Sequence, residues 1–369
     1  MTKISLTTLS SLFLLLGNIA FSQTLEDRFQ AILDSAYQDN QTSVGIVIHV
    51  EAPDQNISWN NAIGHSNKAN ADINVQQPAL IASNTKTFVA VAILRLVEMN
   101  NIQLDQPIKS LLSGKTKRRF TKNGYDLDQI TVKHLLSHTS GIDDYVNDDY
   151  FDFIDKNHDY KWTKNKQIKL AMKIGKPLAE AGVLFKYADL NYLLLTEIIE
   201  KITKKPFYTA IRALIDYENH QLHSTWFINL EEMPEQTPPL VHQYWSRYNW
   251  DSYDLNPSWD LYGGGGIVST TKDLALFFQT LFEGEIIKNK QILEAMHTYV
   301  LAKEKSIYCL GIQLISLEGY TVYYHGGFWG TDVVYIPKLN ASIAAFTLQK
   351  DERIINAMIS KEIIKLLKR

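Results

Sequence analysis

Hydrophobic and polar positions near the start of the chain change from a helical to an extended pattern. Apolar residues recur at helical spacing over 25–37, which predicts an amphipathic helix. Two β-branched runs follow at 43–50 and 57–63, and each is typical of a strand. This part of the chain therefore predicts one helix and the first two strands of a sheet.

The other end of the chain shows the same two patterns in the reverse order. Strand patterns cover 320–324, 330–336 and 342–348, and a Pro-containing turn at 337–340 separates the last two. A helical pattern then runs over 354–367. Both ends of the chain thus supply sheet and helix.

The middle of the chain differs from both ends. Residues 86–201 are rich in helical patterns, whereas 230–262 has many Pro, Tyr and Trp residues and no regular period. We therefore predict an α+β fold in which an antiparallel sheet is built from both chain termini, is flanked by helices, and carries an inserted, mainly helical region. A cleft between the sheet and the inserted region is the expected site.

The first 22 residues have the features of a signal peptide. Lys3 precedes a short apolar run at 12–16, and small residues stand at Ala20 and Ser22. The run is short for a membrane span, which disfavours a retained anchor. We expect residues 1–22 to be removed, one domain over 23–369, a periplasmic or secreted location, and no stable membrane anchor after processing.

Composition excludes several classes of protein. The 369 residues are 45% hydrophobic and 21% charged with a formal net charge of −3, as in ordinary globular proteins. Basic residues are dispersed, and the dense run at 115–119 is interpreted as a solvated loop, so no nucleic-acid partner is expected. The single cysteine, Cys309, lies in an apolar stretch and is expected in the core.

Candidate chemistry begins at the segment Ser83-Asn84-Thr85-Lys86. An apolar helical run follows it, which places the Ser83 hydroxyl and the Lys86 amine on one face of a first helical turn. The helix N-terminus carries partial positive charge, so an oxyanion formed at Ser83 would be stabilised there. The spacing alone is weak evidence, because it recurs at Ser269 and Lys272, where Thr270 is better interpreted as a helix cap.

Two further motifs follow in the chain. Tyr187-Ala188-Asp189 stands directly before an apolar-faced helix, so a loop can direct its phenol and carboxylate at a cleft. His325 comes at the end of a predicted strand and is followed by two glycines, of which Gly327 leaves room for a substrate to lie against the backbone. Each motif is unspecific alone.

Taken in this order, the motifs resemble the three conserved boxes of the serine β-lactamase and D-alanyl-D-alanine peptidase superfamily, especially the class C β-lactamases and related esterases. The segments 135–142, 185–194 and 265–270 agree with it, and the likeness runs from about Gly45 to the end of the chain. The resemblance implies that Ser83 attacks an amide or ester carbonyl to form an acyl-enzyme, which water then hydrolyses.

The resemblance also assigns roles to the other residues. Lys86 and Tyr187 share the proton transfers, and His325 completes the catalytic set. The oxyanion lies between the backbone N–H groups of Ser83 and Phe328, while Asp189, Gly327 and Phe328 contact the substrate.

Two positions depart from the family pattern. Asp189 stands where asparagine is usual; if it faces Lys86, the carboxylate favours the ammonium and shifts the role of base toward Tyr187. His325 stands where most β-lactamases have lysine, and a neutral imidazole holds a substrate carboxylate less firmly. A D-alanyl-D-alanine carboxypeptidase-like or related peptidase is therefore favoured over a carboxylesterase or a weak β-lactamase.

Other interpretations remain or are disfavoured. A penicillin-binding or sensor module that acylates without turnover stays open. His134 and His138 have metal-like spacing but lack the Glu of a His-Glu-x-x-His motif, and the glycines at 263–266 lack a following Gly-Lys-Ser/Thr. We therefore expect no metal and no cofactor, and a small peptide, amide or ester as substrate; the oligomeric state is left open.

Overall fold

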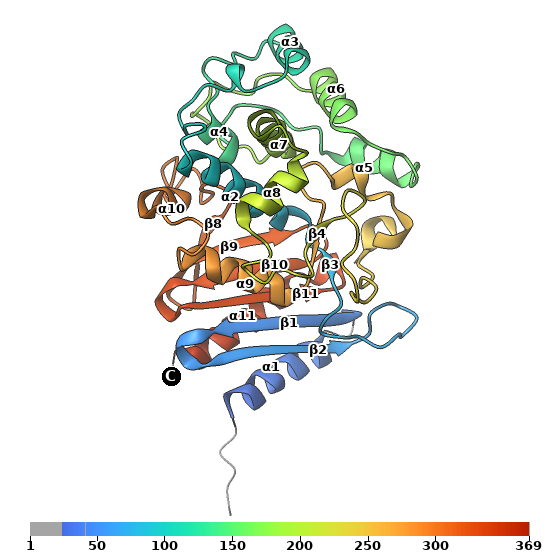
Figure 1. The fold of residues 1–369 in the computed structure, drawn as a ribbon. Coiled ribbons are helices and arrows are strands. Elements are labelled where there is room, and N and C mark those ends of the chain that lie inside the picture. Colours follow the sequence, from blue (N-terminus) through green and yellow to red (C-terminus); the bar gives the residue numbers. More distant parts are fainter. Residues whose placement is uncertain (1–23, 41, 369) are drawn as a thin grey trace, which may run out of the picture.

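The computed structural model describes residues 24–40 and 42–368, and a six-stranded antiparallel sheet lies at its centre (Figure 1). The strand order is β2-β1-β11-β10-β9-β8. Strands from the N-terminal and C-terminal parts of the chain meet in the middle of this sheet, because β1 (Gly45–Ala52) pairs with β11 (Ala341–Thr347). In this pairing Ile46 lies opposite Thr347 and Glu51 opposite Ser342. The sheet therefore joins segments about 300 residues apart in the chain.

The remaining strands extend this sheet on both sides. β2 (Ile57–Gly64) lies outside β1, while β10 (Thr331–Ile336), β9 (Tyr320–Gly327) and β8 (Gln313–Leu317) follow β11. Each neighbouring pair is antiparallel. The prediction of an α+β fold with a sheet built from both termini is confirmed.

Two helices from the ends of the chain cover one face of the sheet. α1 (Leu25–Asp39) and α11 (Ile354–Leu367) pack against each other and against β2 and β11. Their apolar side chains, including Phe29 and Ile359, form a buried cluster with alternate residues of the strands. The opposite face packs against α9 (Thr271–Phe282) and a second, larger core.

The inserted region stands on that second face and is mainly helical. Its longest helices are α2 (Thr85–Glu98) and α7 (Asp189–Thr203), which are buried in the larger core and contact each other. The other helices surround them: α3 (Gly114–Lys122), α4 (Val132–Leu136), α5 (Asp148–Asp155), α6 (Lys164–Ile174), α8 (Phe207–Ile215) and α10 (Lys290–Met296). The expected helical insertion is confirmed.

Two small sheets lie between the helical region and the main sheet. β3 (Ala79–Leu80), β7 (Ile267–Ser269) and β4 (Trp226–Phe227) form one, and β5 (Tyr244–Trp245) with β6 (Trp250–Asp251) forms the other. The second belongs to the segment without a clear period, which is ordered but irregular, as predicted.

Several local predictions can be compared with the structure. Thr270 caps α9 by accepting a hydrogen bond from the Asp273 N–H, as predicted. The Asp273 carboxylate accepts from the Thr270 hydroxyl and from Ser224 and Thr225, and not from the Thr270 backbone N–H. Cys309 is buried in the core. The run at 115–119 is not a loop but most of α3, because Ser113 caps a helix there and Phe120 anchors it to the core.

The predicted signal peptide, residues 1–22, lies outside the described residues. Among residues 24–40 and 42–368, no helix combines the length and the apolar character needed to cross a bilayer.

Candidate active site

Ser83 lies in a strained turn immediately before α2. The 3₁₀ turn Ala82–Asn84 leads directly into the helix, and Ala82 has a φ of 45°, which is uncommon for a residue with a Cβ. The Asn84 amide donates hydrogen bonds to the Ile81 carbonyl and to Thr331 Oγ1 on β10, at 2.9 and 3.0 Å. This anchoring holds the partly exposed Ser83 side chain between the helical region and the sheet.

Lys86 is fully buried one helical turn after Ser83. Its Nζ donates to Ser83 Oγ at 3.0 Å and to the Gly264 carbonyl at 2.6 Å, and it pairs with Asp189 Oδ1 at 2.7 Å. An ammonium has three N–H donors, so all three are used. Burial lowers the pKa of Lys86, but the attraction of Asp189, Tyr187 and Asp260 outweighs it and raises the pKa well above the ordinary lysine range.

Tyr187 lies beside both of these side chains. Lys86 Nζ is 4.9 Å from the centre of the Tyr187 ring, and the ring packs against His138 at 4.3 Å. Burial raises the pKa of the Tyr187 phenol, whereas Lys86 and the Ser83 hydroxyl act in the opposite direction. The structure therefore brings Ser83, Lys86 and Tyr187 together as predicted.

Asp189 begins α7 and faces Lys86, which is the arrangement that the sequence analysis considered. The carboxylate of Asp144 accepts hydrogen bonds from the backbone N–H groups of Asp189 and Leu190, at 3.0 and 3.3 Å, and so caps this helix. Burial and the neighbouring Asp189 raise the pKa of Asp144 to about 7. The same two causes raise the pKa of Asp260 well above its ordinary range.

The glycine run at 263–266 allows these groups to approach. A Cβ on Gly264 would lie 2.8 Å from the Asp189 carboxyl carbon, and one on Gly265 would lie 2.0 Å from an Asp260 oxygen. The Gly264 carbonyl is also a partner of Lys86. The backbone thus approaches both carboxyl groups closely here, and it forms one wall of the site.

His325 does not contact Ser83, Lys86 or Tyr187 by a hydrogen bond within the described chain. Its Nε2 lies 3.0 Å from the Tyr308 hydroxyl, and Tyr308 packs edge-on against Tyr187. Burial, with a further contribution from Lys86, lowers the pKa of His325 to about 3. The imidazole is therefore neutral at pH 7, and Tyr308 lies between it and the Tyr187 ring.

Gly327 ends β9 against the Ser83 turn. A Cβ at this position would lie 2.2 Å from the Ile81 carbonyl oxygen and 2.2 Å from Thr331 Oγ1, so a larger residue would separate the strand from the turn. This close contact brings the backbone of the next residue, Phe328, toward Ser83. Gly327 thus serves packing, and its contact with the substrate stays a prediction.

The Phe328 side chain belongs to an aromatic cluster next to the site. Its ring is stacked with Phe151 at 5.7 Å and lies edge-on to Trp245 and Trp259 at 5.0 and 5.4 Å. Trp245 and Trp259 are buried, whereas Phe328 is partly exposed. The cluster therefore offers a rigid aromatic surface beside the serine.

The second Ser-x-x-Lys segment does not form a comparable site. The Ser269 hydroxyl is buried and lies 2.8 Å from the Thr225 hydroxyl, while Lys272 is exposed on α9.

The two histidines with metal-like spacing each make a hydrogen bond to the backbone. His134 accepts from the Thr131 N–H at the start of α4, and His138 accepts from the Ala188 N–H beneath Tyr187.

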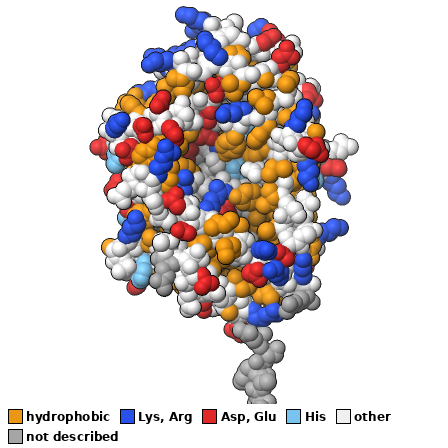
Figure 2. Space-filling view, turned by 180° about the vertical axis from the view of Figure 1, so that it is seen from behind, with side chains coloured by type: hydrophobic (Ala, Val, Ile, Leu, Met, Phe, Trp, Pro, Cys, Tyr) orange, Lys and Arg blue, Asp and Glu red, His pale blue; other side chains and the backbone are white. Residues whose placement is uncertain are grey.

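The sequence analysis did not identify Tyr308, Asp144 or Asp260 as parts of the site. None of them lies in one of the three motifs, and their contacts join segments far apart in the chain. Asp144 lies in a run of acidic and aromatic residues at 143–155, and the density of that run is the one sequence signal that could have pointed to it. Seen from behind, the molecule is hollowed between its helical end and the sheet, with hydrophobic and charged side chains around the hollow (Figure 2).

The fold and this constellation define a hydrolase of the β-lactamase fold. The β-lactamase family model matches residues 29–355, which is most of the chain, and this protein belongs to that family.

Individual relatives agree with this assignment. The chain is 27% identical over 214 residues to PbpX, a penicillin-binding protein candidate of Bacillus subtilis, covering 57% of this chain and 48% of that protein. The chain thus spans about half the length of the curated relatives it matches.

Two solved structures cover nearly the whole fold. The D-stereospecific amidohydrolase of a Streptomyces species superposes with a TM-score of 0.73 at 26% identity, over 88% of this chain and 97% of that one. The D-amino acid amidase of Ochrobactrum anthropi, in complex with L-phenylalanine amide, gives a TM-score of 0.77 at 21% identity, over 93% and 98%. This second likeness supports the fold alone.

Proposed function

We propose that this protein is a serine hydrolase that cleaves amides or esters through an acyl-enzyme on Ser83. The observation that supports this most directly is the 3.0 Å hydrogen bond from Lys86 Nζ to Ser83 Oγ, with Tyr187 beside both groups. A serine hydroxyl becomes an effective nucleophile only when a neighbouring base accepts its proton. Lys86 and Tyr187 are the neighbouring groups that can supply that base.

The geometry favours Tyr187 over Lys86 as the group that accepts the serine proton. Lys86 uses its three N–H donors on Ser83, Gly264 and Asp189, so as an ammonium it has no lone pair to offer. Because Ser83 Oγ accepts from Lys86, its own proton is free to point to the Tyr187 oxygen. Tyr187 can take this proton only as the phenolate, after the phenol has released its own proton to solvent; since burial raises the pKa of Tyr187, the phenolate is the minor form at pH 7 and grows as the pH rises. Tyr187 then passes this proton to the leaving group, while the Lys86 charge stabilises the phenolate.

The developing oxyanion would bind between the backbone N–H groups of Ser83 and Phe328. Ser83 stands at a helix N-terminus, and Gly327 holds the end of β9 against the serine turn. In comparable sites one such donor lowers the barrier by roughly 3 to 4 kcal/mol. Water then attacks the acyl-enzyme and releases the acid, with Tyr187 accepting the water proton.

The substrate that we favour is an amide or ester of D configuration with an apolar group. Two observations support it: the partly exposed Phe328 ring of the aromatic cluster directly follows Gly327, which packs against the serine turn, and the amidohydrolase with which the chain shares 26% identity is described as D-stereospecific. His325 is neutral and lies behind Tyr308, so it supplies no cation for a substrate carboxylate. This argues against efficient β-lactam hydrolysis.

A D-alanyl-D-alanine carboxypeptidase is the second candidate, and Lys350 is the observation that favours it. Lys350 Nζ lies 4.7 Å from the centre of the Phe328 ring and 4.1 Å from that of Trp245. Among the residues described, no carboxylate lies within ion-pair distance of this ammonium. A terminal substrate carboxylate could therefore bind Lys350 instead of His325.

The nucleophile is tested by covalent labelling. A fluorophosphonate or penicillin should label wild type and Ser269→Ala, whereas Ser83→Ala should remain unlabelled and lose ester hydrolysis by roughly a thousandfold or more. Intact-mass measurement reports the adduct. Labelling of Ser83→Ala would show that the nucleophile is another residue, and a lasting adduct without turnover of any ester, amide or peptide would favour the sensor module.

The role of Asp189 is tested by the pH dependence of kcat/KM. The Asp189 carboxylate adds to the effect of burial in raising the pKa of Tyr187, so Asp189→Asn should lower the pKa of this phenol and populate the phenolate at lower pH. The ascending limb of the profile should move to lower pH. Asp149→Asn, an exposed position on α5, is the matched control. Superimposable profiles for wild type and Asp189→Asn would contradict the proposed base.

The two substrate classes are separated by Lys350→Gln. If Lys350 binds a terminal carboxylate, this variant should raise the KM for a D-alanyl-D-alanine peptide by about tenfold and leave the KM for the corresponding peptide amide unchanged. Lys338→Gln removes the same charge at an exposed turn and should change neither value. Equal values for peptide and amide in wild type would exclude this carboxylate contact.

We also propose that the protein is exported to the periplasm or secreted. The support is the leader-like sequence 1–22, which is followed by the capped start of α1 at Thr24. Expression of the full chain should yield a mature protein that begins at or near Gln23. N-terminal sequencing of protein from the periplasm or medium checks this, and an uncleaved N-terminus on that protein would contradict it.

A further inference from the structure

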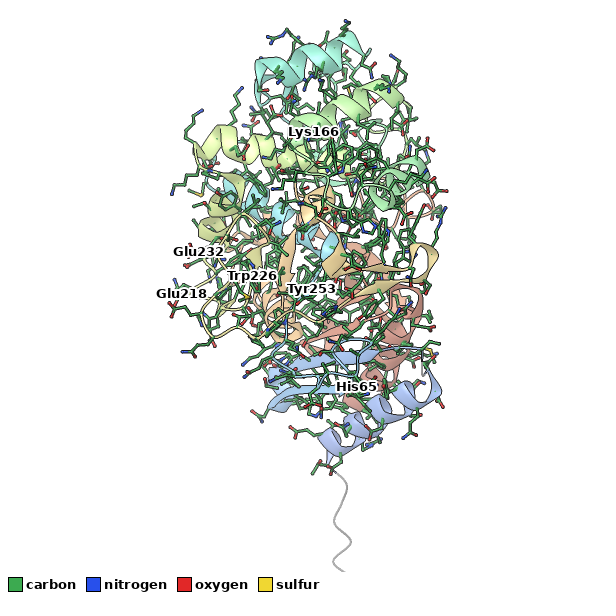
Figure 3. All side chains as sticks on the ribbon, turned by 90° about the vertical axis from the view of Figure 1, so that its right-hand side faces the viewer. His65, Lys166, Glu218, Trp226, Glu232 and Tyr253 are labelled. Atoms are coloured by element: carbon green, nitrogen blue, oxygen red, sulfur yellow. The ribbon has the colours of Figure 1, made fainter. Side chains whose placement is uncertain are left out.

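A groove lined by cationic side chains lies between α3 and α6, at the end of the molecule opposite α1 (Figure 1). It is an open hollow of about 650 Å³ with Tyr160, Trp162 and Leu170 among its apolar wall residues. We call it the basic groove, and its cationic residues are Arg119, Lys122, Lys166, Lys169, Lys173 and Lys176. Lys166 appears at this end in Figure 3.

The two helices are tied together although they lie more than forty residues apart in the chain. Arg119 donates to the Asn165 side chain at 2.8 Å, and the Asn123 amide donates to the Gly175 carbonyl at 2.8 Å. The basic residues of α3 and α6, which are separated in the sequence, therefore lie side by side in the structure. Several Lys and Arg side chains are visible at this end in Figure 2.

The cations of the basic groove lack acidic partners within the described chain. None of the six is within 4 Å of a carboxylate, whereas the nearby Lys109, Lys133 and Lys164 each are. Three further cations of α3 extend the positive surface beyond the groove: Lys115, Lys117 and Arg118. Nine cations therefore lie on or next to α3 and α6, in a chain whose formal net charge is −3.

Apolar side chains are exposed at the edge of the same surface. Ile174, the last residue of α6, is 46% exposed, and Leu178 in the following loop is 43% exposed. Lysine side chains can lay their aliphatic stems along such groups while the ammonium stays in water. A soluble polyanion would leave Ile174 and Leu178 in water, whereas the interface of a bilayer would bury them.

We propose that this end of the molecule binds the surface of a membrane that contains anionic phospholipids. Phosphate head groups would occupy the basic groove and the exposed side of α3, and Ile174 and Leu178 would enter the interface. Because the cations extend over two helices, the complementary partner is a broad negative surface and not a single small anion. The proposal is independent of the chemistry at Ser83.

The experiment is co-sedimentation of the mature protein, without the leader-like residues 1–22, with lipid vesicles. Wild type should bind vesicles of phosphatidylcholine with one-third phosphatidylglycerol at low salt, bind less at high salt, and not bind phosphatidylcholine alone. The triple variant Lys122→Gln, Lys169→Gln, Lys173→Gln should reduce the partition coefficient by roughly tenfold to a hundredfold. Ile174→Ser should weaken binding to the same vesicles at both salt concentrations.

The matched control removes the same charge elsewhere. Lys290→Gln, Lys303→Gln, Lys305→Gln alters three exposed lysines outside the basic groove and should bind like wild type. Unfolding temperatures that agree among all variants establish that each is folded. Equal binding of the two triple variants, or no binding of wild type to the anionic vesicles, would overturn the proposal. Binding to inorganic polyphosphate but not to vesicles would also overturn it, in favour of a soluble polyanion.

Discussion

The candidate site depends on one buried ammonium group. Lys86 is completely enclosed, and a buried charge is tolerated only when hydrogen bonds and an opposite charge replace its water. Here one carbonyl, one carboxylate and the serine hydroxyl take that place. These partners come from three separate segments, so the same interaction that compensates the charge also fixes Ser83, Asp189 and the glycine run relative to one another.

The architecture makes this convergence possible. The two chain ends form the sheet, and the helical insertion returns to it through the serine turn, which Asn84 fastens to β10. Gly327 permits the end of β9 to touch the carbonyl of Ile81. The serine therefore stands where the helical region and the sheet meet, and small changes of packing on either side would move it relative to the proposed oxyanion donors.

The sequence predicted the parts of the structure that depend on local pattern. The helix at 354–367 and the paired strands near it follow from apolar periodicity, and the position of Tyr187 before α7 follows from the polar-to-apolar change at Asp189. The resemblance added the order of the motifs. It could not place Tyr308 between His325 and Tyr187, because that contact depends on a loop whose path has no periodic signal.

The same limit explains the misinterpreted segment at 115–119. A dense run of basic residues favours a solvated loop when it is considered alone, but a serine cap and the buried Phe120 are sufficient to form a helix. The cations then acquire neighbours on α6 that the sequence separates from them by more than forty residues. The sequence alone thus shows fewer neighbouring cations than the folded chain brings together.

The two departures from the family pattern change the electrostatic potential of the site with the same sign. Asp189 introduces a carboxylate where an uncharged amide is usual, and a neutral His325 stands where a lysine ammonium is common. Each change makes the interior of the site more negative. Burial, together with the neighbouring Asp189, raises the pKa values of Asp144 and Asp260, which keeps additional negative charge out of the pocket. An anionic substrate group is therefore disfavoured near Lys86 and can be accommodated only farther out, beside Phe328, where Lys350 is the available cation. This separation of charge supports neutral amides and esters as the primary substrates.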